Sequence, residues 1–170
     1  PLIISPDWHH LMYDKSSRLK NQTIDEVEYY FIKSNKYFGN GFKRILNMFW
    51  FSFKMIFKKK LNNKYKPDII ISSSPHLPSF LGAYILSKKH NAKLILEVRD
   101  IWPLSITKLT KTSNYHPFVL LLGIIEKFAY ERCHHLVTLL KGSNKYFSKF
   151  KIPLDKITYI PNGLIIDNQI

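Results

Sequence analysis

The stretch LILEVRDIWPLS, residues 94–105, joins an apolar run to a cluster of charged and aromatic side chains. Residues 92–99 are mostly apolar without alternation, which is typical of a strand buried on both faces. Arg99, Asp100 and Trp102 follow at once, with no ordinary loop residues between. Because ligands of open parallel sheets bind beyond the carboxyl ends of the strands, this stretch predicts a core strand whose end carries functional side chains.

Similar strands alternate with helical segments on both sides of this stretch. The predicted strands cover residues 1–5, 27–33, 67–74, 92–99, 135–140 and 155–163, and the predicted helices cover residues 41–60, 77–90, 116–133 and 143–150. Pro117 suits the first turn of one helix, Ser143 is the expected cap of another, and the polar residues 15–23 are expected to form a loop. The alternation predicts an α/β protein with a Rossmann-like parallel sheet and helices on both faces.

The composition indicates a globular domain in a reducing compartment. The chain has 170 residues, of which 45% are hydrophobic, enough for a real core. Its one cysteine, Cys133, excludes an internal disulfide and is expected to be a small buried apolar side chain. No signal peptide is visible, and because the chain begins at Pro1 rather than Met, the true N-terminus is expected to be missing.

The net charge of +14 is concentrated in one segment. Residues 42–66 contain seven lysines and one arginine and no acidic residue. On a helix, Lys43, Asn47, Lys54 and Lys58 fall on one narrow stripe, and most of the remaining circumference is apolar. Two alternatives follow: a well-buried helix with a narrow solvated stripe, or a helix with one apolar flank in a bilayer interface and its lysines at anionic headgroups. The expected membrane-facing residues are Lys43, Arg44, Trp50, Lys54 and Lys58.

Each polar motif of the chain follows a predicted strand, so five loops are expected to meet at one edge of the sheet. Asp100 is a candidate to bind hydroxyl groups, and Arg99 is expected to keep it ionised and oriented. The alternative is that Asp100 caps a helix beginning near Pro103. Glu97 is expected to pair with Arg99 rather than to act in catalysis.

The other candidate residues have simpler alternatives. SSSPH, residues 72–76, supplies hydroxyls and the His76 imidazole, or forms an ordinary serine cap. Asn162 and Gly163 belong to a PNG segment that is expected to turn, with Gly163 at positive φ. His9 and His10 have no further ligand cluster, so a metal site is not expected.

Four segments, in this order and spacing, closely resemble the N-terminal half of family 4 retaining glycosyltransferases with the GT-B fold. They are PDIIISSSPH (67–76), LILEVRDIWPLS (94–105), IEKFAYERC (125–133) leading into HLVTLLKG (135–142), and DKITYIPNG (155–163). The nearest match is the group that builds capsule and O-antigen precursors, including fucosamine-transferase-like members. One departure is Leu104, where many relatives have glutamate.

This resemblance implies one half of a two-domain enzyme. Residues 1–163 would form the Rossmann-like acceptor-binding domain without its first strand and loop, residues 164–170 would begin the crossover, and the donor-binding C-terminal domain would be absent. The expected catalytic residues are Asp100 and His76, which would position the acceptor hydroxyl. The expected acceptor-binding residues are Ser74, Arg99, Trp102, His9 and His10, and the expected donor-side cleft residues are Asn162 and Gly163.

The function expected from the resemblance is transfer of a sugar from a nucleotide-sugar to a lipid-linked saccharide in surface-polysaccharide synthesis. The complete enzyme would lie in the cytoplasm on the inner face of the cell membrane and would need no metal or other cofactor, whereas this chain alone would be inactive. Two alternatives stay open: a truncated non-catalytic scaffold, and a basic module that binds nucleic acid.

Overall fold

The computed structural model describes residues 1–8, 21–35, 42–58, 64–74 and 77–163. The chain divides into two compact units, residues 1–65 and 66–170, and each is described by itself. The single domain predicted for residues 1–163 and the crossover predicted for residues 164–170 stay predictions.

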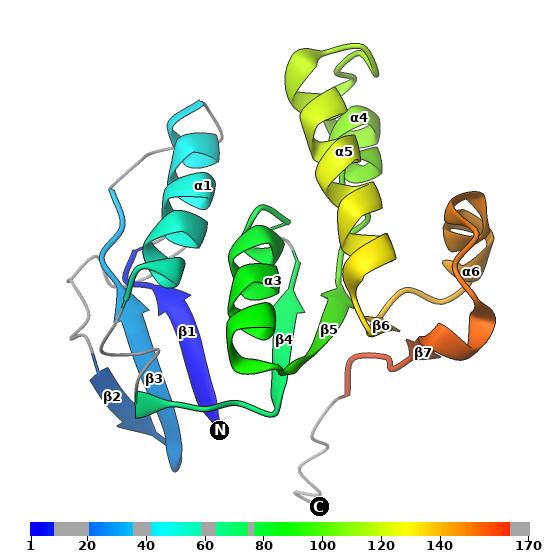
Figure 1. Ribbon diagram of the computed structural model, residues 1–170. Coiled ribbons are helices and arrows are strands. Elements are labelled where there is room, and N and C mark those ends of the chain that lie inside the picture. The colour runs from blue at the N-terminus through cyan, green and yellow to red at the C-terminus, as the bar shows by residue number, and fades with distance from the viewer. Residues whose placement is uncertain (9–20, 36–41, 59–63, 75–76, 164–170) are drawn as a thin grey trace, which may run out of the picture. The chain divides into compact units, whose positions relative to one another are not determined.

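The described residues of the first unit include a small mixed sheet and a long helix (Figure 1). The strands are β1 (Leu2–Pro6), β2 (Asn21–Ile24) and β3 (Val27–Ile32), in the spatial order β1-β3-β2, and the helix is α1 (Phe42–Ile56). β1 pairs with β3 in parallel and β2 pairs with β3 antiparallel. The predicted strands and helix of this region are therefore confirmed.

β2 is an addition to the prediction, because a loop was expected over residues 15–23. Its residues Asn21, Gln22 and Thr23 are polar and have no apolar alternation. The hairpin depends instead on its turn, in which Asp25 and Glu26 have φ angles of 48° and 62°. Positive φ at both central residues is the geometry of the two-residue turn that matches strand twist.

Polar contacts join the ends of β1 and β3 to α1. The Asp7 carboxylate accepts hydrogen bonds from the Ser34 backbone N–H at 2.7 Å and from its hydroxyl at 2.8 Å. The Asn47 side-chain oxygen accepts from the Asn35 backbone N–H at 3.1 Å. Asn47 is only 3% exposed, so its predicted place on a solvated stripe of the helix is wrong.

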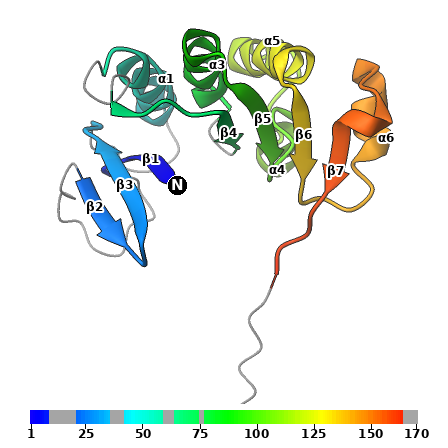
Figure 2. The same ribbon diagram turned by 60° about the horizontal axis from the view of Figure 1, so that its bottom comes forward.

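The second unit is a parallel sheet flanked by helices. Its strands are β4 (Ile69–Ser73), β5 (Lys93–Val98), β6 (His135–Thr138) and β7 (Ile157–Tyr159), in the order β4-β5-β6-β7. Its helices are α3 (Ser79–His90), α4 (Leu104–Thr110), α5 (Pro117–Arg132) and α6 (Asn144–Phe147), with short 3-10 turns η1 (Ser148–Phe150) and η2 (Leu154–Lys156). Figure 2 shows α3 and α5 over one face of the sheet and α4 on the other side of β5. The predicted α/β class is confirmed.

The core of this unit lies between the sheet and the two long helices. Alternate strand residues Leu94, Leu96 and Leu136 are at most 1% exposed, and the helix residues Phe80 and Leu122 are fully buried. Burying a side chain of this size contributes about 1.5–3 kcal/mol. The same alternation places Ile71 and Ile95, which are register partners, on the opposite face.

Two local predictions in this unit are wrong. Ile69 and Ile71 of β4 are 56% and 63% exposed, although their apolar run predicted burial on both faces. Ser143 precedes α6 but its side chain makes no cap bond. Its hydroxyl lies 3.1 Å from the Thr138 hydroxyl instead, so the buried pair satisfies itself at the end of β6. Pro117 does occupy the first turn of α5 as expected.

Candidate functional site

Ser74 connects the end of β4 to the loop that follows β5. Its hydroxyl oxygen accepts hydrogen bonds from the backbone N–H groups of Arg99 at 2.9 Å and Asp100 at 3.3 Å, and its own N–H donates to the Glu97 carbonyl at 2.9 Å. Ser74 is only 3% exposed. The side chain predicted to bind an acceptor is therefore bonded to the backbone that carries Arg99 and Asp100, which makes Ser74 a positioning residue in this structure.

Replacing Ser74 by alanine is expected to lower the free energy of unfolding by roughly 1–2 kcal/mol, because two backbone N–H groups lose their acceptor. Urea unfolding would measure the change. Ser148→Ala is the matched control, since that exposed hydroxyl donates to the nearby Lys145 carbonyl, and surface changes of this kind usually stay within about 0.5 kcal/mol. Equal stability of the two variants would contradict the positioning role.

Arg99 and Asp100, the two charged residues that follow β5, are exposed. Among the residues that the structure describes, neither Arg99 nor Glu97 takes part in an ion pair, and the Asp100 carboxylate has no hydrogen-bond or ion-pair partner. The expected Glu97–Arg99 pair is wrong, because the Glu97 carboxylate accepts a hydrogen bond from the Ser73 hydroxyl. The expected orientation of Asp100 by Arg99 is likewise not found as an ion pair.

The segment after Asp100 turns into α4 through a cis Trp102–Pro103 peptide bond. The N-cap of α4 is Pro103, with no side-chain cap bond. The alternative in which Asp100 caps this helix is therefore wrong, and its carboxylate remains available at the carboxyl edge of the sheet. Trp102 is half-buried.

Asn162 and Gly163 lie beyond β7, at the same carboxyl edge, because all four strands are parallel. β6 separates β7 from β5, so with strands about 4.8 Å apart the two residues follow a strand that lies roughly 10 Å from β5. Both are exposed, and residues 161–163 form no turn. Gly163 is not among the positive-φ residues, so the predicted turn is wrong.

The remaining predicted site residues cannot be placed with this group. His9, His10 and His76 lie outside the described residues. Within the described part of the chain, no group of three or more His, Cys, Asp or Glu residues is arranged to hold a metal ion. His134 and His135 are engaged elsewhere: the first accepts from the Leu94 N–H at 2.9 Å and the second lies 2.8 Å from the Thr158 hydroxyl.

Cys133 is buried at 3% exposure, as expected of a small apolar side chain. Burial raises the pKa of its thiol, which disfavours the reactive thiolate.

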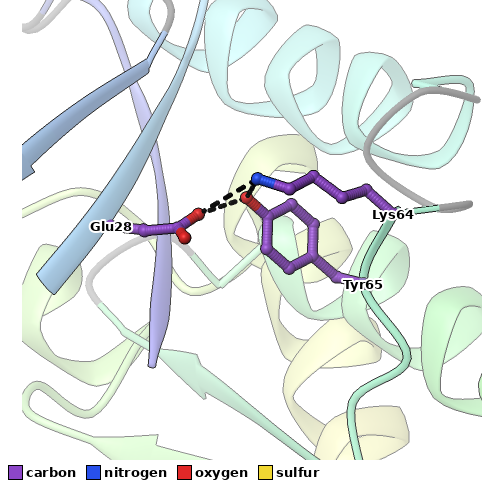
Figure 3. A network of polar contacts seen from close by, with 3 residues as sticks. All are labelled: Glu28, Lys64 and Tyr65. Atoms are coloured by element: carbon purple, nitrogen blue, oxygen red, sulfur yellow. Dashed lines mark hydrogen bonds and ion pairs between the residues drawn. The ribbon is translucent and has the colours of Figure 1, made fainter.

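A polar hollow in the first unit was not predicted. It has a volume of about 250 Å³ and is lined by Leu2, Asn21, Gln22, Thr23, Glu28, Tyr29, Tyr30, Lys64 and Tyr65. Figure 3 shows the Glu28 carboxylate facing the Tyr65 hydroxyl and the Lys64 ammonium. The Tyr65 hydrogen bond, followed by the Lys64 charge, holds the pKa of Glu28 below its usual value. No sequence signal pointed to this network, because Glu28 and Tyr65 are 37 positions apart.

The predicted membrane-facing residues lie on α1 or, for Lys58, just beyond its end, and they differ in their exposure. Lys43 and Trp50 are exposed, whereas Arg44, Lys54 and Lys58 are half-buried. The Lys54 ammonium donates to the Lys33 carbonyl at 2.7 Å, and burial is the main cause that lowers its pKa. The exposure of Trp50 shows that the alternative of a well-buried helix with a narrow solvated stripe is wrong.

A comparison with protein families gives one finding and a search of curated proteins gives none. The model of Glycosyltransferase Family 4 matches residues 7–168, which include β3, every strand of the second unit and the Ser74–Asp100 cluster. No curated protein matches the chain. Because the family match covers nearly all of the sequence, including the parallel sheet and its carboxyl edge, the chain belongs to Glycosyltransferase Family 4.

Proposed function

We propose that this chain is the acceptor-binding half of a retaining glycosyltransferase. The complete enzyme moves a sugar from a nucleotide-sugar to a lipid-linked saccharide in surface-polysaccharide synthesis, at the inner face of the cell membrane. Membership of Glycosyltransferase Family 4 supports a sugar-transfer role. The nucleotide-sugar would bind mainly to a C-terminal donor domain, and this half would need no metal or other cofactor.

The observation that carries this proposal is the exposed Asp100 carboxylate on a loop fixed by Ser74. The loop is held by two backbone hydrogen bonds to a buried hydroxyl, so the carboxylate extends from a rigid base at the carboxyl edge of a parallel sheet. A carboxylate accepts hydrogen bonds more strongly than a neutral group. Asp100 is therefore well suited to hold the hydroxyl of an incoming saccharide.

In the proposed reaction the acceptor oxygen forms a bond to the anomeric carbon on the same face from which the diphosphate leaves, so the configuration is retained. The bond from that carbon to the diphosphate breaks, and the proton of the acceptor hydroxyl passes to the departing diphosphate. Asp100 positions the acceptor hydroxyl and favours loss of its proton, and His76 would assist it. Trp102 offers an aromatic surface to the sugar rings. The charge on the leaving diphosphate would be stabilised by the donor domain.

An assay of sugar transfer tests the proposal. The complete enzyme is incubated with a radiolabelled nucleotide-sugar and a lipid-linked saccharide, and the label should appear in the lipid product only when both are present. NMR of the product should give the same anomeric configuration as the donor. Transfer with inverted configuration would overturn the retaining assignment.

Binding experiments with this chain alone distinguish the proposal from its two alternatives. It should bind the lipid-linked saccharide in a titration without turning it over. Failure to bind any saccharide would favour the non-catalytic scaffold. Strong, salt-dependent binding of oligonucleotides without saccharide binding would favour the nucleic-acid alternative.

A further inference from the structure

One side of α1 and the residue after it exposes a row of large apolar side chains. Leu46, Trp50, Phe53 and Phe57 are 52%, 43%, 49% and 64% exposed. Their spacing of four, three and four positions places them along one side of the helix, and they are called the aromatic strip below. An exposed row of this kind is unusual, because apolar patches on soluble domains tend to mark interaction sites.

The aromatic strip is not explained by loose attachment of the helix. Residues on the opposite side are at most 6% exposed: Asn47, Met48, Phe51, Ser52 and Met55. The helix is therefore packed on one side and presents the strip on the other. The strip is also preassembled, since Trp50 stacks on Phe53 at 5.6 Å and Phe53 contacts Phe57 at 4.6 Å between ring centroids.

Positive charge lies along one border of the strip. Lys43 is exposed, and the Lys54 ammonium lies 5.1 Å from the centre of the Trp50 ring. Lys58 lies two residues beyond the end of α1. The surrounding residues 42–66 contain no Asp or Glu to offset these lysines. A surface that combines aromatic rings with lysines complements an anionic membrane interface.

The geometry of the helix decides between lying on a bilayer and crossing it. α1 has 15 residues, about 22 Å at 1.5 Å per residue, and no described helix is long and apolar enough to span a membrane.

The rings of Trp50 and Phe53 are nearly parallel, with an interplanar angle of 10°. Their facing surfaces are thus occupied by each other, which leaves less ring surface for stacked bases than a nucleic-acid site offers.

We propose that the aromatic strip of α1 inserts into the interface of a bilayer that contains anionic lipids, with Lys43 and Lys58 against the headgroups. The helix axis lies parallel to the membrane plane, and the packed side of α1 remains against its own unit. This deepens the proposed function, because it names the surface on which a lipid-linked acceptor is found. It does not require sugar transfer, since docking depends only on α1.

Vesicle co-sedimentation tests the strip. The chain is mixed with phosphatidylcholine vesicles with and without phosphatidylglycerol. The triple variant Trp50→Ala, Phe53→Ala, Phe57→Ala should lose on the order of tenfold or more in partitioning to the anionic vesicles, because binding scales with buried apolar area. The control is Leu120→Ala, Ile124→Ala on α5, which removes apolar side chains that are 52% and 68% exposed and should leave partitioning within about twofold.

The contribution of Lys43 and Lys58 is tested separately from that of the aromatic strip. Lys43→Gln and Lys58→Gln should each lower partitioning to anionic vesicles by about fivefold and leave binding to neutral vesicles unchanged. The tryptophan emission of the wild type should shift to the blue on binding, and Trp50→Phe should remove most of that shift. All variants alter exposed or half-buried side chains, and circular dichroism checks that they fold.

Three outcomes would overturn the proposal: equal partitioning of the strip variant and the wild type, loss of binding only in the α5 variant, or binding of oligonucleotides but not of vesicles. The transfer assay separates this proposal from the proposed function. Normal vesicle docking without any sugar transfer would overturn the enzymatic role alone. Sugar transfer to the lipid-linked saccharide without vesicle docking would overturn only the membrane proposal.

Discussion

Replacing Asp100 by alanine in the complete enzyme is expected to lower kcat/KM for sugar transfer on the order of 10²–10⁴-fold, the usual contribution of a positioned acid or base. The fold should remain intact, because Asp100 is exposed and its side chain bonds to no other described residue. The measurement is the initial rate of label transfer to the lipid-linked saccharide, together with urea unfolding of the same variant.

Two further variants give this prediction its specificity. Asp100→Asn keeps a hydrogen-bond acceptor but removes the charge, so it should retain binding of the acceptor and lose most of kcat. Asp155→Ala is the matched control, because Asp155 is also exposed but lies in η2, at the amino end of β7. It should stay within about twofold of the wild type, as surface changes usually do. Turnover of Asp100→Ala equal to that of Asp155→Ala would remove Asp100 from the site.

The second large effect concerns Glu126, a carboxyl group buried in α5. It is 2% exposed and accepts hydrogen bonds from the Tyr130 hydroxyl at 2.9 Å and from the Tyr146 hydroxyl at 3.0 and 3.1 Å. Burial raises the pKa of Glu126 to about 7, and the two tyrosine hydrogen bonds oppose this rise. The pKa values of Tyr130 and Tyr146 are also raised, mainly by burial and then by the nearby carboxylate.

This raised pKa makes the stability of the protein depend on pH. Between the ordinary value of 4.5 and about 7, the folded state binds a proton that the unfolded state has lost. Stability therefore falls as the pH rises through this range, and the loss is complete above about 7. At 1.36 kcal/mol per unit of pKa, the total is about 3 kcal/mol.

Glu126→Gln should remove this loss, because glutamine keeps an oxygen that accepts from both tyrosines but carries no charge. The test is urea unfolding of wild type and variant at pH 5 and pH 8. The readout is the change in the free energy of unfolding between the two pH values, compared between the two proteins. Contributions from all other groups are common to both proteins and cancel. The same pH dependence in both proteins would show that Glu126 does not titrate in this range. Tyr146→Phe should steepen the dependence, since one of the bonds that opposes the rise is lost.

The sequence predicted most elements of the sheet because their apolar pattern is local. β5 (Lys93–Val98) lies within the predicted residues 92–99, and α5 (Pro117–Arg132) lies within residues 116–133. β2 escaped prediction because its strand is polar and its turn uses Asp25 and Glu26 rather than glycine. The exposure of Ile71 also escaped prediction, since an apolar run does not reveal which face lacks a covering helix.

The candidate site was only partly predictable. Placing Ser74 beside Arg99 and Asp100 followed from the rule that parallel strands end at one edge, and the structure confirms that contact. The partner of Glu97 did not follow, because residue spacing suggested Arg99, whereas the strand register brings Ser73 opposite it. Glu126 offered one local signal, Tyr130 four positions later on the same helix face, but Tyr146 approaches from another helix.

The amino-acid sequence by itself determined the α/β class, the position of each core strand, and the concentration of positive charge near α1. These follow from composition and from periodicity over a few neighbouring residues. Only the tertiary structure decided that the Ser74 hydroxyl accepts hydrogen bonds from the backbone, that Glu126 is buried and bonded to two tyrosines, and that Trp50, Phe53 and Phe57 are exposed. Each of these depends on which distant segment covers a side chain, and burial and hydrogen bonding are set by that packing.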